Sequence, residues 1–171
     1  KPNTAAVKSL DYETASDGAR GMYKGNVTSL NISDKYAHSG GKALEVSTAA
    51  VNNTIGFNLN ELFAMTLEKD KSYYISCRVY IPAEYGKMTV GMYKHGESSF
   101  TRKEFADAGV WIPLSGVCTA DKTSNNLIML YANFAESSGG SFYIDDFSAA
   151  EVSDSEIYIS EIEYDADDMV N

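Results

Sequence analysis

The sequence of 171 residues has no long apolar run, a single tryptophan, two histidines and two cysteines. No apolar segment approaches the roughly 20 residues that a membrane-spanning helix needs, so we expect no membrane partner. Basic residues are also few, with 14 Lys and Arg against 24 Asp and Glu and a net charge of −10. Because phosphate backbones are bound by basic patches, this composition argues against nucleic acid as a partner.

The negative charge is concentrated at the C-terminal end. Residues 151–171 hold eight acidic residues and no Lys or Arg, so the rest of the chain carries only −2 of the net charge. Ile157, Ile159 and Ile162 form a partly alternating piece among Glu residues, which is typical of an edge strand whose acids discourage pairing. We therefore expect one β-domain over residues 1–157, followed by an acidic edge strand, linker or tail over residues 158–171.

Cysteine usage and the start of the chain say little about the compartment. Cys77 and Cys118 fall at apolar positions of expected strands, which favours two buried thiols and leaves a disulfide open. The sequence starts without Met and shows no signal peptide, and we interpret it as a mature or excised module.

Motifs that carry catalysis are missing. The sequence has no Gly-x-Ser-x-Gly elbow, no HExxH or CxxC motif and no phosphate-binding glycine loop. A small jelly-roll glycosidase or lyase stays open, because it would need only two carboxylates about 5–9 Å apart. No expected strand shows an isolated Glu flanked by aromatic residues on its polar face. Glu45 and Glu104 are the nearest candidates, and we expect no enzyme.

The sequence is rich in short segments in which apolar and polar residues alternate with period two, and it has 12 tyrosines. Helical evidence is limited to residues 60–67, with Asn60 as the expected cap. Short strands separated by turn residues predict an all-β fold of two packed antiparallel sheets, a β-sandwich of the jelly-roll kind. The expected strands cover residues 27–32, 43–47, 54–59, 72–81, 87–93, 111–119, 127–134 and 141–149.

The strand over residues 72–81 has the clearest two-faced pattern. One face is apolar, while the other presents Tyr74, Ser76, Arg78 and Tyr80. Tyrosine rings can stack on the apolar face of a sugar, and the guanidinium and hydroxyl can bond its hydroxyl groups. This face predicts a polysaccharide site, although cross-strand packing of each tyrosine is an equal alternative and Arg78 could form a surface salt bridge.

Five further residues are candidates by the same logic. Tyr93, Tyr131 and Asn133 lie on polar faces of expected strands, and Glu97 and Arg102 lie on an expected polar loop over residues 94–108. Loops at the rim of a rigid sandwich often carry recognition.

Five segments, in order, resemble the signature of carbohydrate-binding modules of the family 4, 9, 16, 22 and 27 type. They are Tyr12-Glu13, the glycine turn and strand of residues 38–46, Tyr73-Tyr74-Ile75-Ser76, a Trp-Leu-Gly-Thr series at residues 111, 114, 116 and 119, and Tyr143-Ile144-Asp145-Asp146-Phe147. The resemblance covers roughly residues 10–150, and Tyr12 stands where such modules carry phenylalanine.

Such modules usually hold a structural calcium ion, and the resemblance places its ligands at Glu13, at backbone carbonyls of the turn Ser39 to Lys42, and at Asp145 or Asp146. The ligand chemistry agrees, because calcium takes six to eight oxygens from carboxylates and carbonyls. Asp145 and Asp146 could instead be ordinary strand-end residues. A calcium ion here would stabilise the fold and would take no part in catalysis.

Together these features predict a non-catalytic, monomeric carbohydrate-binding module from an extracellular protein. It would recognise internal chains of a soluble β-linked plant cell-wall polysaccharide (β-1,4-glucan, mannan or xylan) and target a glycoside hydrolase or assembly in the same parent chain. A structural or adhesion β-sandwich of a cell-surface or cellulosomal protein is the alternative.

Overall fold

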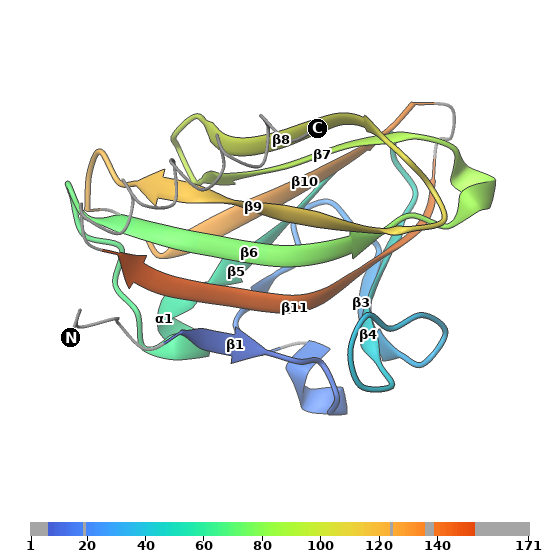
Figure 1. Ribbon diagram of the computed structural model, residues 1–171, viewed down its shortest axis with the longest axis horizontal. Coiled ribbons are helices and arrows are strands. Elements are labelled where there is room, and N and C mark those ends of the chain that lie inside the picture. The colour runs from blue at the N-terminus through green and yellow to red at the C-terminus, as the bar shows by residue number, and fades with distance from the viewer. Residues whose placement is uncertain (1–6, 19, 124, 136–138, 153–171) are drawn as a thin grey trace, which may run out of the picture.

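The computed structural model describes residues 7–18, 20–123, 125–135 and 139–152. Two antiparallel sheets lie face to face, as expected for a jelly-roll β-sandwich (Figure 1). The first sheet has the strand order β3-β4-β11-β6-β9, with β1 also paired to β11, and the second has the order β2-β5-β10-β7-β8. The strands are β1 (Lys8–Leu10), β2 (Met22–Tyr23), β3 (Ser29–Ser33), β4 (Ala43–Thr48), β5 (Asn52–Asn58), β6 (Ser72–Tyr80), β7 (Met88–Lys94), β8 (Ser99–Ala106), β9 (Trp111–Thr119), β10 (Leu127–Phe134) and β11 (Gly140–Val152).

Inward-facing residues of both sheets form one apolar core. The alternation of β6 buries Tyr73, Ile75, Cys77 and Val79, as its sequence pattern predicts. Between the sheets, the rings of Phe57 and Phe147 stack at 3.9 Å with an interplanar angle of 4°. Burying this apolar area is the main force that holds the sheets together.

Both cysteines are buried, unpaired thiols, which confirms the interpretation of small apolar side chains. Burial raises the pKa of Cys77 to about 12 and that of Cys118 to about 11. A thiol with so high a pKa stays protonated at neutral pH and is inert as a nucleophile.

The short helices connect strands and carry none of the candidate residues. Helix α1 (Leu59–Phe63) begins two residues earlier than expected, because Asn58, and not Asn60, is its cap. The Asn58 Oδ1 accepts hydrogen bonds from the backbone N–H groups of Asn60 at 3.1 Å and Glu61 at 3.2 Å. The others are the 3-10 helices η1 (Ala15–Gly18) and η2 (Ala83–Tyr85). Over the described residues, no helix has the length and apolar character needed to cross a bilayer.

Strand β8 was not expected, because residues 94–108 were interpreted as a loop. Its pairing with β7 contains two register shifts, and most of its residues are exposed, so the period-two pattern is interrupted. The acidic segment expected to form an edge strand, linker or tail lies outside the described residues, which end at Val152.

Candidate functional site

The residues that the sequence predicts to bind sugar lie on two opposite surfaces of the sandwich. Tyr74, Ser76, Arg78 and Tyr80 are on the outer face of the first sheet, because they alternate with core residues of β6. The other strand candidates, on β7, β8 and β10, belong to the second sheet. One polysaccharide chain crossing a single face therefore cannot contact both groups.

On the first sheet, Tyr80 is covered by aromatic neighbours. Its ring lies 4.4 Å from that of Tyr36 and 5.4 Å from that of Trp111, centroid to centroid. Tyr36 also meets Tyr143 edge-on at 4.9 Å. These contacts favour a packing role for Tyr80, while Tyr74, with 39% of its surface exposed, stays open to solvent.

Glu45 and Glu104 do not form a pair of facing carboxylates. Glu45 lies on β4 of the first sheet and accepts a hydrogen bond from the Tyr143 hydroxyl at 2.7 Å. Glu104 lies on β8 of the second sheet and forms an exposed ion pair with Arg102 at 2.8 Å. Since a glycosidase needs two carboxylates across one bond, these two acids cannot act together.

The outer face of the second sheet gathers Tyr93, Tyr131, Asn133 and Arg102. Met129 and Tyr131 of β10 pair with Tyr93 and Gly91 of β7, and Gly91 pairs with Arg102 of β8. The rings of Tyr93 and Tyr131 lie 6.1 Å apart at an angle of 38°. Two half-buried rings thus stand beside a guanidinium and an amide, a combination that suits a sugar ring with its rim of hydroxyls.

Gly91 determines where the Tyr131 ring lies. A Cβ atom added at Gly91 would be 2.2 Å from the Tyr131 Oη and 2.3 Å from its Cζ, so the ring rests directly on the glycine backbone. The Tyr131 hydroxyl continues across β7 and is bonded to the Ser99 hydroxyl at 3.3 Å. A side chain at position 91 would lift the ring from this position.

Sequence reasoning missed Tyr23, which extends the same face to the opposite edge. Tyr23 on β2 pairs with Gly56 on β5, which in turn pairs with Met129 on β10, and 55% of the tyrosine surface is exposed. Glycine inside a strand marks a close approach of neighbouring groups. The glycines at 56 and 91 were therefore the available sequence signal for the close packing on this face.

Glu97 has a structural position. Its side chain is only 10% exposed, lies 3.4 Å from the buried Lys94 Nζ, and accepts a hydrogen bond from the backbone N–H of Asp121 at 2.5 Å. These contacts link two neighbouring turns, and we leave Glu97 out of the sugar-binding face.

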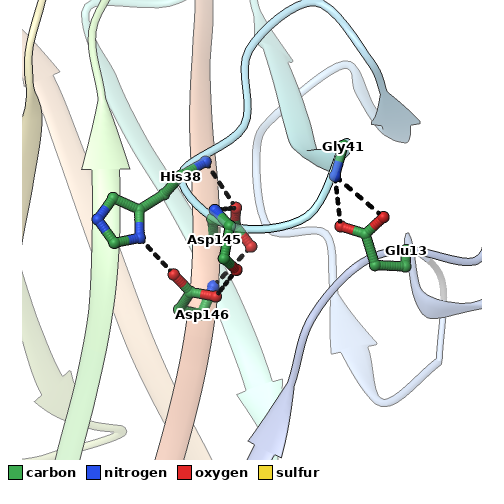
Figure 2. Close-up of polar contacts among 6 residues, drawn as sticks. Glu13, His38, Gly41, Asp145 and Asp146 are labelled. Carbon is green, nitrogen blue, oxygen red and sulfur yellow. Dashed lines mark hydrogen bonds and ion pairs between the residues drawn. The ribbon is translucent and has the colours of Figure 1, made fainter.

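The residues predicted to bind calcium meet at the glycine turn. The two Glu13 carboxylate oxygens each accept a hydrogen bond from the backbone N–H of Gly41 at 3.2 Å (Figure 2). Glu13 Oε1 also accepts one from the backbone N–H of Lys42 at 3.2 Å. On the other side of the turn, Asp145 Oδ2 accepts from the N–H groups of His38 at 2.8 Å and Ser39 at 3.1 Å. The carboxylates therefore fasten the turn to the start and end of the domain.

Asp145 and Asp146 have different surroundings. Asp145 is fully buried, and burial raises its pKa, an effect that the N–H donors of Ser39, His38 and Asp146 partly offset. Asp146 is one-third exposed, lies 2.5 Å from His38 Nδ1 and accepts a hydrogen bond from the Ser39 hydroxyl. Carboxylates and nearby turn carbonyls are ligands that calcium takes. In the described geometry, however, the carboxylates accept N–H donors, and no group of three acidic, His or Cys side chains is placed to hold a metal within the part of the chain that is described.

No protein-family model and no curated protein matches the sequence. Solved structures do match. The CBM22-1 xylan-binding domain from Paenibacillus barcinonensis Xyn10C is 16% identical, with a TM-score of 0.59 over 90% of this chain and 99% of that chain. The C-terminal family 22 carbohydrate-binding module of Clostridium thermocellum Xyn10B is 16% identical, with a TM-score of 0.63 over 88% and 96% of the two chains.

A larger structure, the CBM22-1–GH10 modules of Clostridium thermocellum Xyn10B complexed with xylohexaose, is 18% identical with a TM-score of 0.64. It matches over 88% of this chain and 29% of that chain. Similarity at these identities shows a shared fold, the β-sandwich of carbohydrate-binding modules. The resemblance read from the five sequence segments is confirmed at that level.

Proposed function

We propose that this chain is a non-catalytic carbohydrate-binding module whose binding face is the outer surface of the second sheet. The observation that carries the proposal is the pair of rings Tyr93 and Tyr131 beside Arg102 and Asn133, with the Tyr131 ring resting on the backbone of Gly91. A flat strand surface bearing rings and hydrogen-bonding groups suits an extended polysaccharide better than a small, enclosed ligand.

The ligand we propose is an internal stretch of a β-linked cell-wall polysaccharide, such as β-1,4-glucan, mannan or xylan. Two of the solved structures named above support the proposal, because one is a xylan-binding domain and the other is a complex with xylohexaose. The link to a catalytic module in one of them also supports a targeting role for this chain in an extracellular glycoside hydrolase. Such tethering raises the local concentration of an enzyme at its substrate.

Affinity electrophoresis on gels with soluble glucan, mannan and xylan tests the binding face. We expect at least one polysaccharide to retard the protein, and Tyr131→Ala and Tyr93→Ala to remove most of the retardation. Tyr74→Ala is the matched control, because it removes an exposed tyrosine from the opposite sheet. Retardation that is lost with Tyr74→Ala and kept with Tyr131→Ala would show that the site lies on the first sheet, against the proposal. Absence of retardation on every polysaccharide would refute the function.

We further propose a structural calcium ion at the glycine turn, with Glu13, Asp145 or Asp146 and the carbonyls of Ser39 to Lys42 as its ligands. These groups already join the first and last parts of the domain through one turn. A cation there would reinforce the link by binding only to the folded chain.

A further inference from the structure

A polar pocket lies on the outer face of the first sheet, away from the proposed polysaccharide face. Its volume is about 340 Å³, which falls in the range of small-ligand sites. Apart from Leu10, its lining residues are polar or charged: Ser9, Asp11, His38, Ser76, Arg78, Asp146 and Ser148. The pocket thus combines fixed hydrogen-bond donors and acceptors within a small space.

Arg78 is the principal donor of this pocket. It is half-buried on β6, and its guanidinium has neither a hydrogen bond nor an ion pair with any described residue. Asp145 faces Arg78 across the ladder, but its oxygens already accept three backbone N–H groups. The guanidinium N–H groups that reach the pocket are therefore available to a ligand.

A β-bulge supplies the acceptor. The pairing of β11 with β6 shifts register between Asp145 and Ser148, and Asp146 within the bulge takes a left-handed conformation with φ of 51°. Bulges commonly re-aim a side chain beside a binding site. Here the bulge leaves the carboxylate of Asp146 lining the same pocket as Arg78, without an ion pair between them.

Separated donors and acceptors of this kind match the hydroxyl groups of a sugar. Each hydroxyl can accept from a guanidinium or serine and donate to a carboxylate, and Asp146 keeps free lone pairs beyond its bonds to His38 and Ser39. Two carboxylates against one guanidinium disfavour an anionic ligand by repulsion. The site therefore suits a neutral ligand rich in hydroxyls.

We propose that this pocket binds one neutral sugar residue through its hydroxyl groups, as a second carbohydrate site on the face opposite to Tyr131. Its lining includes no Tyr, Trp or Phe, so the site recognises a single residue by hydrogen bonds and does not hold an extended chain. It does not depend on the polysaccharide face proposed above.

Amide-resolved NMR titration of the whole chain with methyl glycosides of glucose, xylose, mannose and galactose tests the proposal. We expect at least one glycoside to give saturable shifts around Ser76, Arg78 and Ser148. Arg78→Gln should weaken this binding by about tenfold or more, because a charge-assisted hydrogen bond is lost. Ser148→Ala should weaken it by a smaller factor while the spectrum confirms an intact fold.

Arg20→Gln, which removes an exposed arginine elsewhere, should leave the affinity unchanged. Tyr131→Ala should also leave it unchanged, so that failure of the polysaccharide face and failure of the pocket are told apart. The proposal is overturned if no glycoside gives saturable shifts here, or if Arg78→Gln and Ser148→Ala both bind as wild type does. Tighter binding of a methyl glucuronide, or loss of binding with a calcium chelator, would also overturn it in favour of charge recognition or a bridging ion.

Discussion

The substitution Gly91→Ala tests whether polysaccharide binding depends on the position of the Tyr131 ring, because the ring is kept but displaced. The new methyl group would lie 2.2 Å from the Tyr131 Oη and 2.3 Å from its Cζ, far inside van der Waals contact, so the ring must leave the strand surface. A sugar face that covers roughly 60 Å² of this ring contributes about 1.5 kcal/mol at about 25 cal/mol per Å². Losing it should raise Kd for the bound polysaccharide by about tenfold.

Stability should change little, because Tyr131 is only half-buried and can turn toward solvent. Replacing glycine also removes conformational freedom from the unfolded chain, which contributes about 0.4–1 kcal/mol in the opposite sense. The measurements are Kd by calorimetry and Tm for Gly91→Ala, Tyr131→Ala and Gly41→Ala. Gly41→Ala is the control, because a Cβ there meets nothing within 4 Å.

The reasoning is refuted if Gly91→Ala binds as tightly as the wild type while Tyr131→Ala has lost affinity. The contribution of the Tyr131 ring to affinity would then not depend on its position against the Gly91 backbone. If Gly41→Ala weakened polysaccharide binding equally, the effect would come from replacing any glycine by alanine. If Tyr131→Ala bound as the wild type does, the outer face of the second sheet would not be the binding face.

Three other predictions concern stability. Calcium should raise Tm and a chelator lower it, with the difference reduced in Glu13→Gln; an unchanged Tm in protein shown beforehand to be metal-loaded would contradict the ion. The free energy of unfolding should fall as pH rises above about 9. Burial raises the pKa values of Cys77 and Cys118, so above that pH only the unfolded chain releases these protons. Each thiol lowers the free energy of unfolding by about 1.4 kcal/mol per pH unit until its folded pKa is reached. Cys77→Ala should flatten this alkaline slope, and a parallel slope in the variant would count against the assignment. Asn58→Ala should cost about 1 kcal/mol in urea unfolding by removing the helix cap, and a loss below a few tenths would mean that the cap contributes little.

The sandwich itself was predictable because strands with one buried face alternate strictly. Strand β6 alternates over its whole length, and its boundaries and core face follow from the sequence. Strand β8 was missed because only Phe100 and Ala106 of its apolar residues turn toward the core, while Phe105 takes a positive φ and is 61% exposed. A bulged edge strand with charged residues loses the pattern on which prediction depends.

The division of the candidate residues between two surfaces was not predictable from alternation. Alternation shows that Tyr74 and Arg78 share a face, and that Tyr131 and Asn133 share a face, but it does not show which strands belong to one sheet. That depends on pairing between residues far apart, such as Tyr131 with Thr54. Non-local pairing is determined by the whole core, and a single sequence carries little information about it.

The sequence does, in contrast, contain a signal for the bulge in β11 at Asp145 and Asp146. Phe142 and Ile144 face the core on one side of the acidic pair, and Phe147 and Ala149 on the other, so the phase of the apolar alternation changes by one residue between them. A regular strand through this segment would turn one apolar set outward, and one extra residue restores both sets to the core. The same extra residue buries one carboxylate against the turn and leaves Asp146 on the pocket beside Arg78, so the phase change locates both the anchored turn and the proposed sugar pocket.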